Sequence, residues 1–166
     1  MNAERVREAI RSLGSVPIGI TDSESWSDVM SHPDVRDYLA SCVTEEGFDA
    51  SGVGILGMSR LAEENAEGVV PGGQLRKYGY VVVAISVGGN AVALSSSDGR
   101  VYWADHSSFS DDVEISYEDH ETGEWRYSRW SAANVQKALV HLSDSIEEFF
   151  INLIAGRLEE RLNELD

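Results

Sequence analysis

Cysteine is almost absent from this sequence: Cys42 is the only one, so the chain cannot form an internal disulfide bond. Disulfides persist in oxidising compartments and are rare in the cytoplasm, so this composition favours a reducing environment. Cys42 falls on the apolar side of a predicted helix, and no cationic residue lies near it in sequence. We interpret it as a packing residue rather than a reactive thiol, and we expect a cytoplasmic protein.

Long apolar runs are also missing. A membrane-spanning helix needs about 20 apolar residues in succession, and no stretch approaches that length. The opening residues, Met1 to Arg5, lack the apolar segment of a secretory signal. We therefore expect a protein that does not cross a membrane and is not exported by a cleaved signal. Because no repeat or low-complexity linker divides the 166 residues, they predict one domain.

Basic residues are scarce relative to acidic ones. The chain has 13 Lys and Arg against 29 Asp and Glu, which gives a formal net charge of −16. Such a field repels nucleic acid phosphates and anionic membrane surfaces, and it attracts basic proteins. We expect no nucleic acid and no membrane among the partners. The alternative interpretation is that the acidity serves only to keep the protein soluble.

Sequence motifs for common cofactors and metals do not occur. The glycine-rich stretches at 52–57 and 72–73 are not followed by the Gly-Lys-Ser/Thr of a phosphate-binding loop. There is no His-Glu-x-x-His, no cysteine pair and no calcium loop with the required spacing. The acidic residues and histidines between 106 and 121 are therefore interpreted as a solvated hairpin. We expect neither a cofactor nor a metal.

One short stretch, Asp105-His106-Ser107, suggests catalysis. A hydrolase that uses Asp105, His106 or His120 is thus an alternative reading. Catalytic groups converge from distant parts of a fold, however, and three adjacent residues do not form a triad by adjacency. We predict that Asp105 and His106 end a strand and satisfy turn hydrogen bonds, and that the chain is not an enzyme.

The strongest structural pattern lies between Tyr78 and Asp105 and contains three strand-like runs. The first run, Val81 to Val87, is apolar at nearly every position, as in a strand that is buried on both faces. Gly88-Gly89-Asn90 and Asp98-Gly99 supply residues that accept positive φ, which tight hairpin turns need. We predict an antiparallel meander whose second and third strands are half-buried.

Helical and hairpin patterns surround this meander. Residues 2–13 and 33–42 each repeat apolar side chains at helical spacing, and residues 131–140 are predicted as helical. A final single helix begins at Ser143 or Ser145 and keeps one apolar stripe as far as Leu162. Before it, 113–117 and 124–130 alternate as two paired strands, with Trp125, Tyr127 and Arg129 on one face.

These elements predict an α+β fold, with a twisted, mostly antiparallel sheet of about five or six strands between N-terminal and C-terminal helices. The expected division of the single domain 1–166 is a helical part at 1–46, the sheet at 48–130 and C-terminal helices at 131–165.

Four segments, taken in order, resemble the SUKH superfamily of Smi/Knr-type domains. They are Gly54 to Leu61, Tyr80 to Leu94 with its glycine-asparagine turn, Asp98 to His106 with Gly-Arg-Val-Tyr-Trp-Ala-Asp-His, and Ser143 to Phe150 with Ser-Ile-Glu-Glu-Phe-Phe. The resemblance covers roughly residues 50–155. It implies a non-catalytic α+β domain, most often an immunity protein that binds and neutralises a cognate toxin, commonly a nuclease. The alternative that it implies is a regulatory or scaffolding module of the cell-wall-regulator type.

The stretch from Val101 to Trp125 carries the candidate site because it contains no Lys or Arg. Acidic residues and large aromatics alternate through it, and such a surface suits a basic partner protein, since charge steers the encounter and aromatics provide contact energy. The alternative is that the aromatics belong to the core, and for Trp103 and Tyr117 we leave core and interface open. The predicted partner-binding residues are Trp103, Asp105, Asp111, Asp112, Glu118, Asp119, Glu121 and Trp125.

Overall fold

The predicted meander forms the centre of the structure as strands β3 (Tyr80–Ser86), β4 (Ala91–Ser95) and β5 (Val101–Ala104). The computed structural model describes residues 1–166 except Thr21, Ser23, Asp112 and His120. In it β3 pairs antiparallel with β4, and β4 with β5, so the meander is confirmed.

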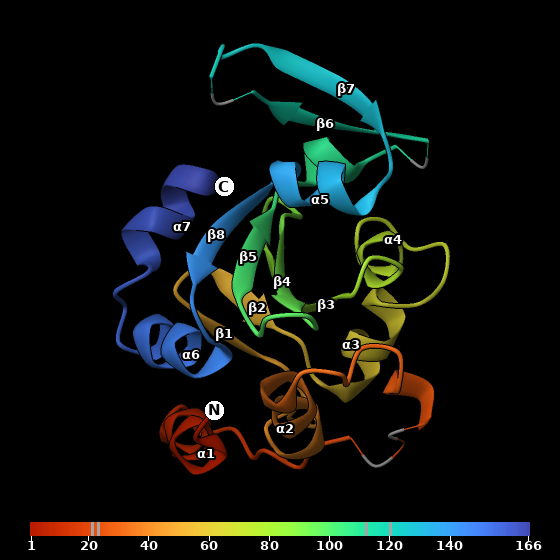
Figure 1. Cartoon of the computed structure of the whole chain (residues 1–166). Helices are drawn as coiled ribbons and strands as arrows, with labels where there is room; N and C mark the ends of the chain where they lie inside the picture. Colours follow the sequence, from red (N-terminus) through yellow and green to blue (C-terminus); the bar gives the residue numbers. More distant parts are fainter. Residues whose placement is uncertain (21, 23, 112, 120) are drawn as a thin grey trace.

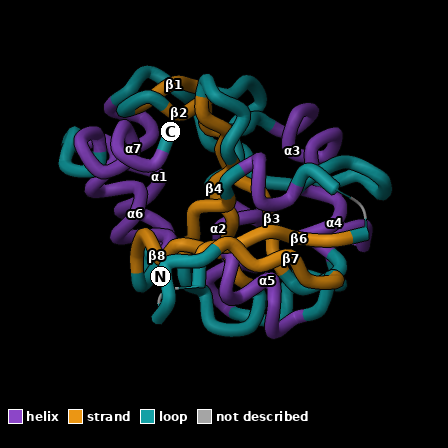
Figure 2. The backbone as a smooth tube through the Cα atoms, turned by 90° about the horizontal axis from the view of Figure 1, so that it is seen from above, coloured by secondary structure: helices purple, strands orange, loops and turns teal. Residues whose placement is uncertain are grey.

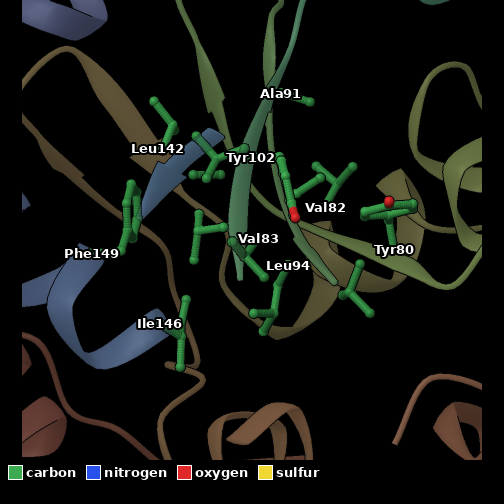
Figure 3. Packing of buried hydrophobic residues seen from close by; sticks show 14 of the residues in the cluster. Tyr80, Val82, Val83, Ala91, Leu94, Tyr102, Leu142, Ile146 and Phe149 are labelled. Carbon is green, nitrogen blue, oxygen red and sulfur yellow. The ribbon is translucent and has the colours of Figure 1, made fainter. Parts of the chain in front are cut away.

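Burial of the meander differs from the prediction in two respects. Every residue of β4 and β5 is buried, so the expectation that they are half-buried is wrong. Adjacent residues of a strand point to opposite faces, so the burial of both Tyr102 and Trp103 shows that both faces are covered. Figure 3 shows Ile146 and Phe149 on one side of these strands and Tyr80 on the other. The first run also ends one residue early, because Val87 is 96% exposed in the turn after β3.

Within the described residues, six strands form one antiparallel sheet in the order β1-β2-β3-β4-β5-β8. The flanking strands are β1 (Phe48–Ala50), β2 (Val53–Ile55) and β8 (Leu139–Ser143). Strands β6 (Glu114–Glu118) and β7 (Trp125–Arg129) pair with each other in a second sheet. The helices are α1 (Ala3–Ser12), η1 (Glu24–Trp26), α2 (Pro33–Ser41), α3 (Met58–Glu64), α4 (Gly72–Arg76), η2 (His106–Phe109), α5 (Ala132–Ala138), α6 (Ile146–Ile154) and α7 (Glu159–Leu165).

This arrangement confirms the predicted α+β class with an antiparallel sheet and terminal helices (Figure 1). One cluster of buried side chains runs from Val6 of α1 to Leu162 of α7. In the described part of the chain, no helix combines the length and the apolar character that a membrane crossing would need.

The C-terminal third contains a strand that the sequence did not predict. Helix α5 forms as expected, and the Ser131 hydroxyl caps it by accepting the N–H of Asn134. Residues 139–143 then form β8 and pair with β5, so the C-terminal part at 131–165 is not wholly helical. A five-residue strand beside a helix has no clear period of its own, and its state is decided by the partner strand. The predicted sheet region at 48–130 needs a matching correction, because β6 and β7 leave the main sheet.

The predicted single helix beyond Ser145 is in fact two helices. Its start is confirmed, since the Ser145 hydroxyl accepts the N–H of Glu148. Helix α6 ends at Ile154, and Gly156 follows with φ of 70°. This left-handed conformation is the usual helix stop, and glycine adopts it without a steric penalty. The apolar stripe survives the break, because Leu158 and Leu162 are both buried.

Helix α4 was also missed, because Pro71-Gly72-Gly73 looks like a turn. The two glycines are there for close packing. A Cβ on Gly72 would lie 2.0 Å from the carbonyl oxygen of Glu64, and one on Gly73 would lie 1.9 Å from that of Ala66. Only residues without a side chain allow α4 to approach the end of α3 so closely.

A buried asparagine joins α3 to the central strand. The ladder between β3 and β4 shifts register between Val82 and Ala84, which leaves main-chain groups of β3 in need of partners. The Asn65 side chain accepts the N–H of Val82 at 2.8 Å and donates to the carbonyl oxygens of Val82 and Leu61, both at 2.8 Å. Asn65 is 1% exposed, so these bonds form away from water.

We predict that Asn65→Ala lowers the free energy of unfolding by about 2–4 kcal/mol, because it leaves the buried N–H and carbonyl oxygen of Val82 without their hydrogen-bond partner. Urea unfolding measured by circular dichroism tests this. Asn163→Ala, at an exposed position of α7, is the control and should change stability by less than about 0.5 kcal/mol. Equal effects of the two substitutions would contradict the role assigned to Asn65.

Candidate protein-binding surface

The hairpin of β6 and β7 stands outside the main sheet, at one end of the molecule (Figure 1). It rests on α5 and η2, and the view from above shows both strands crossing over α5 (Figure 2). Its base is anchored by Trp130, whose indole N–H donates to the carbonyl oxygen of Asp111 at 2.9 Å and whose ring stacks on Tyr78. A second link joins α5 to the sheet, since the Tyr80 hydroxyl donates to the Gln136 side chain at 2.8 Å.

The hairpin has an inward face and an outward face. Cross-strand partners lie on the same face of a ladder, and the pairs Ile115–Ser128 and Tyr117–Arg126 belong to the inward face, where Ile115 is completely buried. The other pairs make up the outward face, which we define as Glu114, Ser116, Glu118, Trp125, Tyr127 and Arg129. Trp125 and Tyr127 are 56% and 73% exposed. Large aromatics this exposed are uncommon outside recognition surfaces.

Two of the predicted acidic residues, Asp111 and Asp119, shape the turns of the hairpin. The Asp111 carboxylate accepts the N–H groups of Val113 and Glu114, and the Asp119 carboxylate accepts those of Glu121 and Thr122. These hydrogen bonds favour the ionised carboxylate. The N–H of Val113 and then that of Glu114 lower the pKa of Asp111.

The same reasoning applies to the tip of the hairpin. The N–H of Glu121 is the main cause that lowers the pKa of Asp119, and the N–H of Thr122 and the Arg126 guanidinium add to it. Asp111 and Asp119 are therefore side chains that hold the backbone, in addition to any charge that they offer a partner.

Charge is distributed unevenly over the two faces. Arg126 bridges Asp119 at 3.4 Å and Glu124 at 3.2 Å, so a single guanidinium offsets part of the charge of these two carboxylates. The ammonium of Lys137 lies 5.5 Å from the centre of the Tyr117 ring on the inward side. Among the described residues, by contrast, no ion pair involves Glu114, Glu118 or Glu121. The outward face and the tip thus carry carboxylates that form no ion pair among the described residues, and Arg129, the cross-strand partner of Glu114, is the one cation within the outward face.

The structure brings together only part of the predicted site. Glu118 and Trp125 are direct cross-strand partners on the outward face, and Asp119 and Glu121 lie at the adjoining tip. Trp103 is 1% exposed in β5, so its assignment as a contact residue was wrong: the sheet is covered on both faces and leaves it no access to a partner. Asp112 lies outside the residues that the structure describes.

Asp105 is placed at the start of η2. Its carboxylate accepts both the N–H and the hydroxyl of Ser107 at 2.7 Å, which is the turn role expected of it. The main-chain N–H of His106 donates to the side chain of Asn90 at 2.7 Å. His120, the third residue of the hydrolase alternative, is not among the described residues. Within those residues no group of three or more His, Cys, Asp or Glu side chains is placed to hold a metal ion.

Glu114 and Tyr127 were missed as site residues, although the signal for them was present. The alternation in 124–130 already put Tyr127 on one face with Trp125. The pattern does not tell which face of an isolated hairpin meets the protein. That depends on the contact between Ile115 and the core beneath it.

One groove adjoins the hairpin, and a second groove lies at the other edge of the main sheet. The first, of about 410 Å³, separates the hairpin tip from α5 and is lined by Tyr117, Glu118, Asp119, Glu121, Gln136 and Lys137. The second, of about 590 Å³, lies along β1 and β2, where Phe48, Asp49 and Arg60 contribute to its walls. Of the predicted site residues with described positions, three line the first groove and none lines the second.

Comparisons with protein-family models, with curated proteins and with solved structures yielded no match for this chain. The resemblance to the SUKH superfamily therefore stays a prediction from the sequence.

We predict that Asp119→Ala loosens the hairpin at pH 7, because it removes the acceptor for two tip N–H groups. Amide exchange at Tyr117 and Arg126, measured by NMR, should speed up several-fold while exchange in β3 to β5 stays unchanged. The control is Glu121→Ala, which removes a neighbouring charge but no acceptor of a turn hydrogen bond.

The pH dependence of the native chain has a defined sign. Because the folded-state pKa values of Asp111 and Asp119 are lowered, their contribution to hairpin stability is complete above about pH 4 and is lost as the pH falls below that. The protection factor of the Tyr117 amide, which is its exchange rate corrected for the intrinsic pH dependence of exchange, should therefore decrease below about pH 4 in the native chain and change less in Asp119→Ala. A hairpin that loosens on raising the pH from 5 to 8 would contradict this account.

Proposed function

We propose that this chain is a protein-binding domain that docks a basic partner protein on the outward face of the β6–β7 hairpin. The observation that carries the proposal is the pairing of exposed aromatics with carboxylates. Trp125 and Tyr127 lie on β7, and Glu118 and Glu114 lie across from this strand on β6. Aromatic side chains supply contact area at low entropic cost, and carboxylates around them steer a basic surface and fix its orientation.

The support for a macromolecular partner comes from the shape of the surface. The outward face is a two-stranded ribbon that projects from the fold (Figure 1), whereas small ligands bind in concave sites that enclose most of their surface. The negative charge that remains on this face opposes a nucleic acid ligand, because phosphates would meet carboxylates.

The resemblance to the SUKH superfamily leads us to propose more specifically that the partner is a toxin, and that this chain is its immunity protein in the cytoplasm. A nuclease toxin binds phosphates with Lys and Arg, so its substrate cleft has the charge that the outward face complements. The chain would then neutralise the toxin without chemistry, by covering that cleft or a site beside it.

Growth rescue tests the immunity role. Co-expression of the native chain with the protein encoded beside it should restore the growth of cells that this neighbour kills, and the two purified proteins should form a complex. If complex formation occurs without toxicity or rescue, the chain is a regulatory binding module instead. If neither complex nor rescue is observed, the immunity proposal fails.

Charge reversal on the outward face tests the docking site. The double variant Glu114→Lys and Glu118→Lys should slow association with this partner by about tenfold or more at low salt, and the difference from native should shrink as salt screens the charges. The matched control reverses Glu159 and Glu160 on α7, which changes the net charge equally at another surface. Among the described residues no backbone N–H donates to the side chains of either pair, so the described turn hydrogen bonds are preserved. Equal losses in both variants would assign the effect to net charge and remove the hairpin as the docking site.

A further inference from the structure

Among the described residues no strand pairs with the outer edge of β7, and of the main-chain groups on that edge the Arg129 carbonyl oxygen accepts a hydrogen bond from the Asn134 side chain. Within the part of the chain that the structure describes, β7 pairs only with β6, and no helix or strand lies beyond it in Figure 1. The strand is five residues long and contains no proline. An edge of this kind presents a row of main-chain donors and acceptors that another strand can join.

The hydrogen-bond pattern identifies which groups face outward. The N–H of Asp119 donates to the carbonyl oxygen of Glu124 at 2.9 Å, so this pair is of the hydrogen-bonded type. Bonded and non-bonded pairs alternate along an antiparallel ladder, which makes Glu118–Trp125 and Ser116–Tyr127 non-bonded pairs. The main-chain groups of Trp125, Tyr127 and Arg129 therefore point to the outer edge. The Arg129 carbonyl oxygen agrees with this, because it accepts from the Asn134 side chain at 3.0 Å rather than from β6.

We propose that β7 pairs antiparallel with β7 of a second copy of this chain, centred on Tyr127, to give a four-stranded ribbon β6-β7-β7-β6. In this register Tyr127 faces its own copy and exchanges both main-chain hydrogen bonds with it. Trp125 faces Arg129 of the other copy, which places a guanidinium beside an indole ring. On the opposite face Arg126 meets Ser128.

Charge selects a second copy over a strand of the basic partner. The only charged residues of β7 are Arg126 and Arg129, so a lysine-rich or arginine-rich strand would meet like charges at this edge. In the self-paired register no two charges lie directly opposite each other. Arg126 comes within diagonal reach of its copy, and its charge is already balanced by Asp119 and Glu124.

This pairing is independent of the proposed partner. It uses the edge of β7, whereas the partner would cover the outward face, which stays open in the ribbon. Four aromatic side chains, two Trp125 and two Tyr127, would then lie in one row. The net charge of −16 per chain opposes the approach of two copies at low salt. Added salt should therefore strengthen the dimer, although it weakens binding to a basic partner.

Sedimentation velocity of the native chain tests the proposal from about 10 µM to about 1 mM, the range suited to a transient interface. A monomer–dimer equilibrium is expected. Its association constant should rise between low salt and about 0.5 M sodium chloride, because salt at that concentration screens most of the repulsion between the two acidic chains. Tyr127→Pro removes one edge N–H per copy without touching the bonds to β6. It should weaken the dimer by about tenfold or more. A native chain that stays monomeric throughout, or a dimer unaffected by Tyr127→Pro, would overturn the proposal.

Disulfide cross-linking provides a second test of the dimer, which remains informative if Tyr127→Pro disturbs the hairpin. Tyr127→Cys places two thiols across the two-fold axis at a Cα separation of about 5.5 Å, which a disulfide can bridge. The control is Thr122→Cys at the exposed tip, where the two copies lie roughly 30 Å apart in this register. Native Cys42 is buried and serves as the background. Under mild oxidation only Tyr127→Cys should give a covalent dimer, and equal cross-linking of both variants would show that the association is not through β7.

Discussion

The double-sided burial of the central sheet is the constraint on which the rest of the molecule depends. Strands β4 and β5 have no solvent-exposed residue, and β3 is nearly the same. Such a sheet contributes stability but has no free face with which to recognise another molecule. Any binding surface must be built from elements added around it. The hairpin of β6 and β7 is an element of this type, since it leaves the sheet after β5 and returns to it through α5 and β8.

Among the described residues, the Tyr38 hydroxyl and the Trp103 indole N–H are buried without a hydrogen-bond partner, whereas main-chain groups of β3 are satisfied by a side chain. The register shift in β3 could not be relieved by water, and Asn65 resolves it with three hydrogen bonds at 2.8 Å. The glycines of α4 also allow close packing. Because Gly72 and Gly73 have no side chain, the carbonyl groups of Glu64 and Ala66 occupy the space that a Cβ atom would need.

Local patterns in the sequence were sufficient for the meander, the start of helix α6 and the hairpin, because each of these has a short-range physical cause. The apolar run at Val81 and the glycines at 88–89 define a strand and its turn within a few residues. Elements whose state depends on distant partners were not predictable in this way. Strand β8 is a strand because β5 offers it an edge, and Trp103 is buried because it lies between β4 and β8 in a sheet that is covered on both faces. For the candidate site, the acidic composition was visible, but the face that meets solvent was not. The packing of Ile115 into the core determines which face of the hairpin meets solvent, and this packing is a tertiary contact.

In the hairpin, aspartates hold the backbone of the turns and glutamates lie on the outward face. This difference in role has a consequence for how the surface can diverge between related chains. Asp111 and Asp119 bind backbone N–H groups through a side chain that is one methylene shorter than that of glutamate, so replacing them by a residue without a short acceptor side chain alters the turns of the ribbon. Glu114, Glu118 and the aromatics beside them only occupy positions on it. New combinations at those positions would leave the turns and the buried sheet intact. A chain built in this way can change what it recognises through a few neutral exchanges, while the selective pressure for folding acts on a different set of residues.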